Sequence, residues 1–470
     1  MPMLAAYQSA WPGNAMERKG SHMGNKTIYS LLVLIGIISA ATTVQAGGYT
    51  DTYGFGSRAM SLGGAFTAVA DDYSAAYYNP AGLGQIKGHH FALEYHYTMP
   101  DIEVKKANGE DLVIYGPDGV VRTDPTDSAA SNGLDLGLPE IGFVLDINKI
   151  AKLPVKTTFG LVACLPEQSD IAYRIHDMPP DQPHLIRYGD NIDRITLAVG
   201  VGVEAVKDVV YIGGGVQAML YGPGSFYVDG LTLDPGNVVS KSEFGALLKY
   251  EPMFGLLLTP FDKHVRIGLS WKDEQELKLG VIPVVATVSA GGLDVNVPMN
   301  LDINAFFTPE EYSAGLAFDF DPVMISFEVD KQMWSNYEYS VTDSYHYPDP
   351  ADFDDTYNYR VGLEYKLNKK TSLMAGYYRQ PSPVPDQSGR VSNYIDLDKD
   401  CFSLGGSYIL DPGFGITKGP VKLAGNVVYQ MFKDLDVNKD GVTGVSWVNQ
   451  ESYTVEGSAL LAGVSMTVSW

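Results

Sequence analysis

The C-terminal segment Tyr453–Trp470, YTVEGSALLAGVSMTVSW, decides the fold class of this chain. From Leu460 to Trp470, apolar side chains occupy every second position, and most intervening positions carry glycine, serine or threonine. A period of two places successive side chains on opposite faces of a β-strand. The segment therefore predicts a strand with one apolar face and one small, polar face, ending on an aromatic residue.

The same period recurs along the chain from residue 88 onward. In 89–98, for example, Phe91, Leu93, Tyr95 and Tyr97 share one face, and His90, Ala92, Glu94 and His96 share the other. Comparable segments lie at 141–147, 157–165, 195–204, 210–220, 253–259, 265–272, 314–320, 323–331, 357–367, 371–379, 401–410, 421–431 and 453–470. Most are roughly ten residues long, which is the length that a tilted strand needs to cross a bilayer.

Alternation alone also fits a water-soluble β-sandwich, but three features favour a transmembrane antiparallel β-barrel. The second face is rich in Gly, Ser and Thr, and aromatic residues recur near segment ends, as in an interfacial girdle. Short connections (259–264 and 368–370) alternate with long ones, which are 99–138, 166–192, 272–310, 336–356 and 380–400. A closed barrel is the sheet that satisfies all its backbone hydrogen bonds in lipid. The final Trp470 is typical of bacterial outer-membrane barrels, whose last strand is a signal to the barrel assembly machinery.

The composition excludes several other classes of protein. The chain has 33 Lys and Arg against 56 Asp and Glu, a formal charge of −23, which disfavours nucleic-acid binding. A mean hydropathy of −0.05 excludes a bundle of transmembrane helices. Charged residues make up 19%, below the usual proportion of about 25%, and Gly accounts for 50 of the 470 residues. The two cysteines, Cys164 and Cys401, are too few for a disulfide framework, and a buried free thiol is favoured for Cys164.

The N-terminus predicts export. Residues 23–46 contain a basic Lys26, an apolar run and the tripeptide Val44-Gln45-Ala46, as in a secretory signal peptide. Residues 1–22 precede the sensible start at Met23 and are expected to be an extension that is not native. The mature chain would begin at Gly47. Residues 47–87 do not alternate; they are Gly- and Ala-rich, are expected to be helical at Ala65–Ala70 and turn at Asn79-Pro80, and are well placed to plug a barrel formed by residues 88–470.

A specific resemblance appears within this segment. The ordered motifs are Gly56-Ser-Arg58, Leu62-Gly63-Gly64-Ala65, Ala70-Asp71-Asp72 and Asn79-Pro80-Ala81-Gly82-Leu83. Later motifs are Arg266-Ile-Gly268-Leu-Ser270, Asp330…Trp334-Ser335, Tyr359-Arg360-x-Gly362-x-Glu364-Tyr365, Ala375-Gly376-Tyr377 and Pro381-Ser-Pro383-Val-Pro385-Asp386. Together they resemble the FadL/TodX-like (OMPP1) family of outer-membrane transporters for long-chain fatty acids and hydrocarbons. The resemblance covers essentially the whole mature chain and is weakest in the long loops.

The resemblance implies an outer-membrane barrel of about 14 strands, plugged by an N-terminal hatch. A hydrophobic compound such as a long-chain fatty acid would enter an apolar lumen and leave sideways through the barrel wall, without energy input. The same resemblance implies that Asn79, Pro80 and Ala81 position the hatch against the wall, and that Gly47, Gly48 and Tyr49 lie near the ligand. An apolar lumen favours such compounds because burial of each CH₂ is worth about 0.8 kcal/mol. The expected partners are these ligands, outer-membrane lipid and lipopolysaccharide, and a monomer is expected.

No enzyme, cofactor or metal site is predicted. The sequence lacks GxSxG, HExxH and Walker motifs. His89, His90 and His96 cluster on the first predicted strand, but no second set of ligands with metal spacing is visible. Asp436-Val-Asn438-Lys-Asp440 matches the first half of a calcium loop, yet Trp447 stands where that loop needs a bidentate Glu, so an acidic turn is favoured.

Several alternative functions stay open at this point. An aromatic-hydrocarbon channel of the same family would have the same barrel and hatch. A surface adhesin or structural barrel would act through its long acidic loops and would need no lumenal ligand. A general diffusion porin would lack the segment 47–87, and an outer-membrane enzyme would need a Ser/His or metal constellation that the sequence does not reveal.

Overall fold

The structure is a computed structural model that describes part of the chain. The described residues are 49–106, 136–165, 184–188, 196–221, 224–232, 239–244, 247–290, 293–337, 352–412, 419–442 and 451–470. The predicted extension 1–22, the predicted signal peptide 23–46, and Gly47 and Gly48 lie outside these residues.

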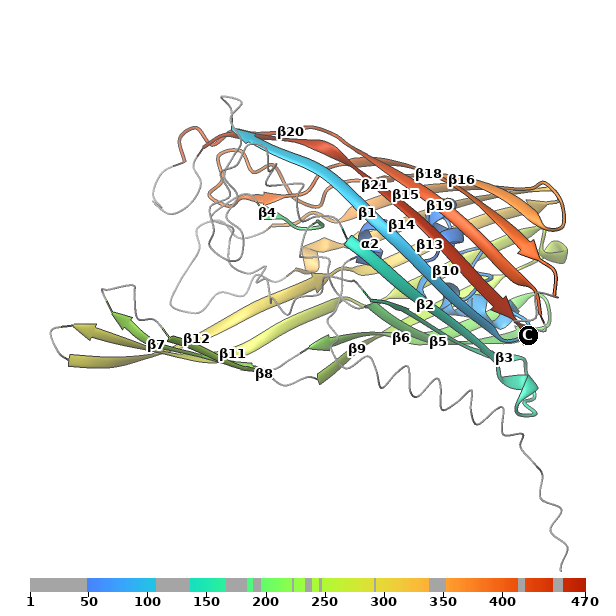
Figure 1. The fold of residues 1–470 in the computed structure, drawn as a ribbon, viewed down its shortest axis with the longest axis horizontal. Coiled ribbons are helices and arrows are strands. Elements are labelled where there is room, and N and C mark those ends of the chain that lie inside the picture. The colour runs from blue at the N-terminus through green and yellow to red at the C-terminus, as the bar shows by residue number, and fades with distance from the viewer. Residues whose placement is uncertain are drawn as a thin grey trace, which may run out of the picture. The chain divides into compact units, whose positions relative to one another are not determined.

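Fourteen antiparallel strands within the described residues form a closed barrel, which confirms the predicted fold class (Figure 1). In ring order they are β1 (His90–Lys106), β2 (Leu136–Asp146), β3 (Thr157–Cys164), β5 (Thr196–Val206), β6 (Val210–Tyr221), β9 (Leu247–Leu258), β10 (Val265–Lys272), β13 (Glu310–Phe320), β14 (Val323–Met333), β15 (Thr356–Lys366), β16 (Thr371–Gln380), β18 (Lys399–Leu410), β19 (Val421–Phe432) and β21 (Tyr453–Ser469). Each corresponds to one of the fourteen segments predicted from alternation.

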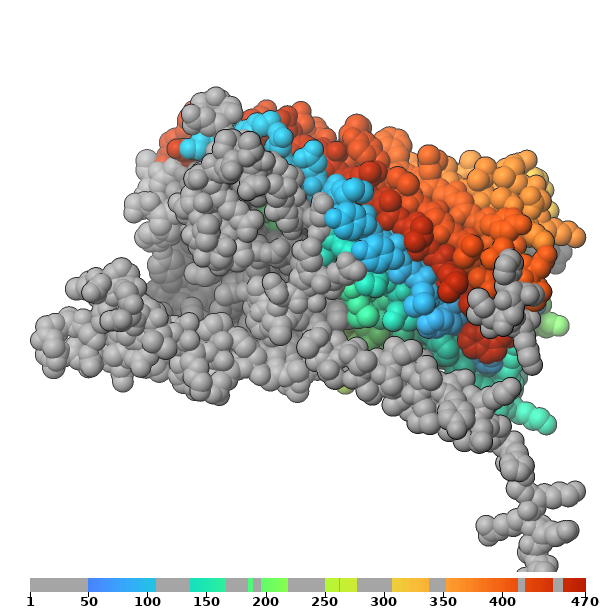
Figure 2. All heavy atoms as spheres, in the orientation of Figure 1, coloured from blue at the N-terminus to red at the C-terminus, as the bar shows by residue number. Residues whose placement is uncertain are grey.

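The barrel closes between its first and last strands. β1 and β21 pair from His90–Ser469 to Lys106–Tyr453, and the two strands run side by side across the face shown in Figure 2. The C-terminal residue takes part in this closure, because the backbone N–H and C=O of Trp470 bond to those of His89 at 3.0 and 3.1 Å. Short connections gather at the end of the barrel where the C-terminus lies, and the strand ends that lead into the long connections lie at the other (Figure 1).

The strand alternation separates a lipid face from a lumen face. On β1, Leu93, Tyr95 and Tyr97 are 38–42% exposed, whereas Glu94 and His96 between them are at most 6% exposed. The apolar residues are therefore exposed on the outside, as a membrane barrel requires, and the polar residues are buried inside. Among the described residues, no helix is long and apolar enough to cross a membrane.

The predicted loop at 272–310 is wrong, because this segment forms a hairpin of β11 (Gln275–Ala290) and β12 (Leu293–Thr308). Its first arm is rich in β-branched residues, which favour strands even without strict alternation. β11 pairs in parallel with β7 (Gly224–Thr232), which pairs with β8 (Val239–Phe244). β1 also extends to Lys106, into the predicted loop at 99–138. The remaining strands are short: β4 (His184–Leu185), β17 (Tyr394–Ile395) and β20 (Leu435–Val437).

Residues 49–87 fold as a compact segment packed against the inside of the barrel; we call this segment the hatch. It contains α2 (Tyr49–Tyr53), α3 (Ser57–Ser61), α4 (Ala75–Tyr78) and the 3-10 helix η1 (Pro80–Gln85). Further 3-10 helices are η2 (Ile147–Lys149), η5 (Phe261–Lys263) and η6 (Trp334–Asn336), which follow barrel strands.

The helix predicted at Ala65–Ala70 is wrong, because this stretch consists of turns. Gly63 and Gly64 before it have φ of +65° and +73°, which a right-handed helix excludes. The amide N–H of Thr67 donates to Glu328 at 2.6 Å and its carbonyl accepts from Asn79 at 2.8 Å. These contacts take the backbone groups that a continuous helix would use.

Candidate functional site

Glycines on the lumen face let the hatch approach the barrel wall. At each of them, an added Cβ would lie within van der Waals contact of a hatch atom or closer. They are Gly142, Gly160, Gly202, Gly213, Gly255, Gly268, Gly315, Gly362, Gly376 and Gly405, which we call the glycine ring. These ten positions lie on ten different strands, so the hatch touches the wall around most of its circumference.

The closest fit involves Pro80 and Ala81, two residues for which the sequence predicted a positioning role. A Cβ on Gly213 of β6 would lie 2.2 Å from the backbone nitrogen of Ala81 and the carbonyl carbon of Pro80. The neighbouring Gly214 faces away from the hatch, and a Cβ there would meet the Phe254 ring at 3.4 Å and the Met253 carbonyl oxygen at 3.8 Å. Only a residue without a side chain fits at Gly213, and the hatch backbone occupies that space.

Asn79 joins three backbone segments and is fully buried. Its Nδ2 donates to the carbonyl of Thr67 at 2.8 Å and to that of Leu256, on strand β9, at 3.2 Å. Its Oδ1 accepts from the N–H of Ala81 at 3.1 Å, which caps the start of η1. Asn79 thus fixes one hatch turn, begins the next helix and bonds to the wall.

The predicted N-terminal ligand residues are only partly visible. Gly47 and Gly48 lie outside the described residues, and Tyr49 begins α2. At the other end of α2, the ring of Tyr53 packs edge-on against Tyr188, with centroids 6.4 Å apart. Tyr188 in turn packs against Phe432 of β19 at 5.3 Å. The end of α2 therefore contacts aromatic side chains outside the hatch.

Arg58 holds two parts of the hatch and the wall together. Its guanidinium forms an ion pair with Asp71, also in the hatch, and another with Glu364 of β15 at 2.7 Å. Asp71 also faces Arg266 of β10 at 3.3 Å. Burial of Asp71 raises its pKa, but the two arginines outweigh burial and lower the pKa to about 2. The Asp71 carboxylate therefore stays charged across physiological pH.

Asp51 of α2 has the opposite electrostatic environment. Burial, reinforced by repulsion from Glu311, raises the pKa of Asp51 to about 6, although Lys272 partly opposes the rise. Its carboxylate accepts from Tyr77 at 3.2 Å and from Thr308 at 3.3 Å. The charge of α2 therefore changes near pH 6.

A buried polar cluster joins α3 to strands β1, β2 and β19. His96 Nδ1 lies 3.1 Å from Glu140 Oε1, and His96 Nε2 lies 3.1 Å from Asn426 Oδ1. Glu94 Oε2 accepts from the N–H and Oγ of Ser57 at 2.7 and 2.8 Å. Metal ions are usually held by His, Cys, Asp and Glu side chains. Among the described residues, Glu94, His96 and Glu140 are the group of such side chains whose ligand atoms lie close enough together to hold a metal ion. The sequence does not reveal this group, because Glu140 lies 44 positions from His96.

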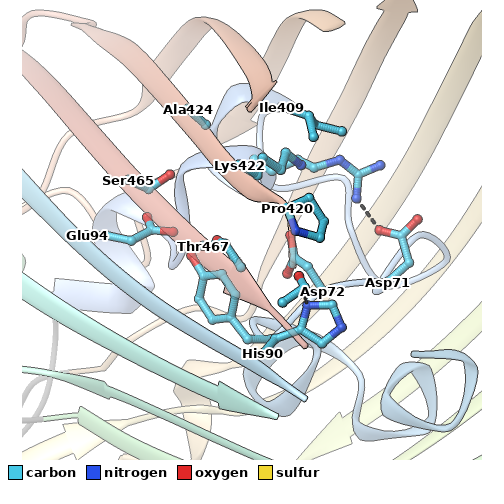
Figure 3. A pocket seen from close by; sticks show the side chains of 13 residues that line it. Asp71, Asp72, His90, Glu94, Ile409, Pro420, Lys422, Ala424, Ser465 and Thr467 are labelled. Carbon is cyan, nitrogen blue, oxygen red and sulfur yellow. Dashed lines mark hydrogen bonds and ion pairs between the residues drawn. The ribbon is translucent and has the colours of Figure 1, made fainter. Parts of the chain in front are cut away.

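A polar cavity of about 200 Å³ adjoins this cluster. Figure 3 shows Glu94 at one side of it and Asp71 at the other, with Lys422 between them. Arg58, the ion-pair partner of Asp71, also lines the cavity. His90, Thr467 and Ser469 also line the cavity, and they lie near the short-turn end of β1 and β21. This part of the lumen is lined mainly by charged and hydroxyl groups.

Toward the long-loop end, apolar side chains become common in the lumen, beside buried polar groups such as Lys399, Gln430 and the Arg187–Asp396 ion pair. The apolar side chains there are buried and belong to one hydrophobic cluster with Tyr53 and Phe55 of the hatch. They are Ile102, Val104, Leu136, Leu138, Tyr188, Ile395, Leu397, Phe432, Val437, Tyr453 and Val455, which we call the apolar section. On β1 the change is direct, because Glu94, His96 and Thr98 are followed by Ile102 and Val104 on the same face.

The acidic turn near Asp436 does not gather its carboxylates as a calcium loop does. Asn438 Oδ1 accepts from the N–H of Asp440 at 2.7 Å. The ammonium of Lys439 donates to three carbonyls of the preceding long loop at 2.6–3.0 Å and is 1% exposed. The lysine thus supplies the positive charge in this turn. Cys164 and Cys401 are buried and do not form a disulfide with each other.

Comparison with known proteins agrees with this geometry. Residues 254–470 match the family model described as outer membrane protein transport protein (OMPP1/FadL/TodX). The chain is 28% identical over 174 residues to alkane uptake protein A of Marinobacter nauticus, an alignment that covers 35% of this chain and 37% of that relative. The chain thus spans about a third of the length of this relative.

Two solved structures share the fold. A FadL homologue of Pseudomonas aeruginosa superposes with a TM-score of 0.57 at 16% identity, covering 91% of this chain and 100% of the other. The toluene transporter TodX of P. putida superposes with a TM-score of 0.51 at 14% identity, covering 89% and 99%. The resemblance predicted from the sequence motifs is confirmed.

Proposed function

Because residues 254–470 belong to the OMPP1/FadL/TodX family of bacterial outer-membrane proteins, we propose that this chain carries hydrophobic compounds across the outer membrane by facilitated diffusion. One observation carries the proposal: a large cluster of buried apolar side chains lies toward the long loops, whereas most of the side chains around the cavity beside the hatch are charged or carry a hydroxyl group. A water-filled porin has a polar lumen throughout. An apolar compound that enters from the long-loop end gains favourable burial in the apolar section.

Entry requires side chains of the apolar section to separate, since they pack against one another. Tyr53, at the end of α2, contacts Tyr188 of this section, so a ligand that parts these rings also displaces the start of the hatch. Two-χ aromatic side chains offer large apolar contact areas at low entropic cost. This placement supports the role proposed for the N-terminal residues Gly47, Gly48 and Tyr49 near the ligand.

The charged groups around the hatch favour an exit through the barrel wall rather than straight through the hatch. The buried charges around Arg58 and Glu94 would impose a desolvation cost on an apolar ligand that continued straight through the hatch. We place the exit at the seam between β2 and β3. There Leu165 donates to the carbonyl of Pro139 at 2.9 Å, but Pro139 has no N–H to donate in return. The ladder therefore weakens where Leu138 of the apolar section adjoins it.

The proposed ligands are long-chain fatty acids or similar lipophiles. Aromatic hydrocarbons are the alternative, since one structural neighbour is named as a toluene transporter, and the relative from Marinobacter nauticus is named for alkane uptake. The apolar side chains of this section can pack against all three kinds of tail, and the ammonium of Lys399 lies beside them, 2.9 Å from the Tyr188 hydroxyl. We also propose that Asn79, Pro80 and Ala81 position the hatch, that the strand ending at Trp470 is read by the assembly machinery, and that the barrel works as a monomer in lipid and lipopolysaccharide.

A substitution in the apolar section tests the ligand site. Val455 is 0% exposed, so Val455→Asp places a carboxylate in a fully buried position. An unpaired buried charge costs several kcal/mol. We therefore expect the affinity for a fluorescent fatty acid, measured in detergent, to fall at least about tenfold. Glu456→Gln, on the adjacent exposed position, should leave the affinity unchanged. Unchanged binding by Val455→Asp would exclude this section as the ligand site.

A reversible cross-link tests the exit. Ile141 and Ala163 are paired across the β2–β3 seam, where the Cα separation of about 5.5 Å permits a disulfide. With Cys164 and Cys401 replaced by alanine, Ile141→Cys/Ala163→Cys should block uptake when oxidised and restore it when reduced. Tyr97→Cys/Ala462→Cys makes the same kind of pair across β1 and β21 and should have no effect. Equal uptake by both oxidised barrels would place the exit elsewhere.

A further inference from the structure

We propose that the lumen contains a zinc site in which His96 Nε2, the Glu94 carboxylate, Asn426 Oδ1 and Ser57 Oγ hold the ion, while Glu140 orients His96. The ligands come from two wall strands and from α3 of the hatch, so the ion would fasten the hatch to the barrel. This site is independent of the transported ligand.

The distances suit tetrahedral zinc. His96 Nε2 lies 3.1 Å from Asn426 Oδ1, 3.5 Å from Ser57 Oγ and 3.8 Å from Glu94 Oε2. Ser57 Oγ lies 2.8 Å from the same Glu94 oxygen. Bonds of about 2.0–2.1 Å in a tetrahedron place the ligands about 3.3 Å apart. These four separations lie on both sides of that value, so small side-chain movements complete the coordination.

The hydrogen bonds of His96 indicate which nitrogen a metal ion would bind. Glu140 Oε1, 3.1 Å from Nδ1, accepts a proton carried there, as carboxylates do behind histidine ligands of zinc. Asn426 Oδ1 can only accept, so without a metal ion Nε2 donates to it at 3.1 Å. The amide of Asn426 is oriented by its Nδ2, which points to Met60 Sδ at 3.5 Å. A zinc ion would displace the Nε2 proton and bind both atoms in its place.

A divalent ion can also balance the charges of this cluster. Glu94 and Glu140 are 6% and 1% exposed, and the single imidazole among them can offset one carboxylate at most. The N–H groups of Gly56 and Ser57 donate to the two carboxylates and supply only dipoles. Zn²⁺ with a neutral imidazole offsets both charges. A nitrogen ligand and four donors favour zinc over calcium or magnesium, which take six or more oxygens.

The site has a route for an ion. Glu94 lines the polar cavity of about 200 Å³ as well as the cluster, and Figure 3 shows its carboxylate at the edge of that cavity. The cavity also reaches Ser469, near the C-terminal end of the barrel. An ion entering from this end would meet Glu94 first and then His96.

Metal content tests the proposal directly. The mature chain, purified from outer membranes in detergent without a histidine tag, is dialysed against limiting zinc and analysed by mass spectrometry. We expect one zinc ion per chain in the native protein and none above background in His96→Ala. His264→Ala should keep the ion, because His264 is exposed at a short turn and bonds to a backbone carbonyl. Cobalt substitution should give the visible spectrum of a tetrahedral site.

Two further variants keep the test decisive if His96→Ala fails to assemble. Glu140→Gln should weaken zinc binding about 10- to 100-fold, as loss of a carboxylate behind a histidine ligand does. Asn426→Asp adds a charged ligand and should retain zinc more tightly. The proposal is overturned if the native chain retains no more zinc than His96→Ala or Glu140→Gln, or if Asn426→Asp loses stability without gaining zinc. Either result would mean that the cluster holds protons only.

Discussion

Replacing Asn79 by alanine should release the hatch from the wall while the barrel persists. The substitution removes the hydrogen bonds to Thr67, Leu256 and Ala81, all of which are inside the protein. Each buried hydrogen bond contributes about 1 kcal/mol, and the Ala81 N–H left without its acceptor adds to the loss. The bond to Leu256 joins the hatch to the wall, and the bonds to Thr67 and Ala81 hold the hatch turns in the shape that fits the wall. The three bonds together are worth about 3 kcal/mol of the free energy that keeps the hatch folded in place, a change of roughly 100-fold in that equilibrium.

Amide hydrogen exchange measures this change. In Asn79→Ala, protection of hatch amides such as Ala81 and Gly82 should fall about 100-fold, whereas amides of the β1–β21 ladder should be unaffected. The barrel should remain heat-modifiable on a denaturing gel. Asn79→Asp keeps the acceptor for Ala81 but sets a carboxylate against two carbonyls, so it should lose at least as much protection. Unchanged exchange in both variants, or collapse of the barrel itself, would refute the positioning role.

Three other predictions concern the same contacts. Gly213→Ala should cost about 1–3 kcal/mol of hatch docking, because its Cβ would lie 2.2 Å from the Ala81 nitrogen. Gly214→Ala should have no effect on docking. Equal exchange protection of the hatch in the two variants would contradict the claim that the glycine ring lets the hatch approach the wall. The pKa of Asp51 is raised to about 6 from 3.8. We therefore expect the folded α2 to be about 3 kcal/mol more stable below pH 4 than above pH 6, and this extra stability to be lost as the pH rises through 6. Exchange of the Gly54 amide, corrected for intrinsic rates, should show this loss in the native chain and not in Asp51→Asn. Arg58→Gln leaves the Glu364 carboxylate without its cation and should weaken hatch docking, as read by proteolysis of residues 49–87; a matched Lys105→Gln, which removes an exposed ion pair, should not.

The strands of the barrel wall were predictable because the membrane requires each of them to alternate lipid-facing apolar residues with lumen-facing residues. Leu93 and Tyr95 must face lipid while Glu94 faces inward, so each crossing leaves a period of two in the sequence. The hairpin at 275–308 was missed because the mouth of the barrel does not impose strict alternation. The helix at Ala65–Ala70 was wrong because Glu328 and Asn79 take its backbone groups, and no local pattern announces those contacts.

The buried cluster was beyond prediction for a similar reason. His96 and Asn426 are 330 positions apart, and they meet because β1 and β19 both border β21. Neither strand alone shows a ligand spacing. The hatch motif, in contrast, was recognisable because Asn79, Pro80 and Ala81 are consecutive, although their contact with Gly213 depends on the closed ring.

The central claim is that the chain carries hydrophobic compounds through the outer membrane. The most direct measurement is the initial rate of uptake of labelled oleate and toluene by cells that lack the gene, complemented with the native chain or with a variant lacking residues 47–55. We expect deletion to lower uptake of at least one of these compounds, the native chain to restore it, and the truncated chain not to restore ligand-dependent uptake. Unchanged uptake of both compounds after deletion would contradict the central claim.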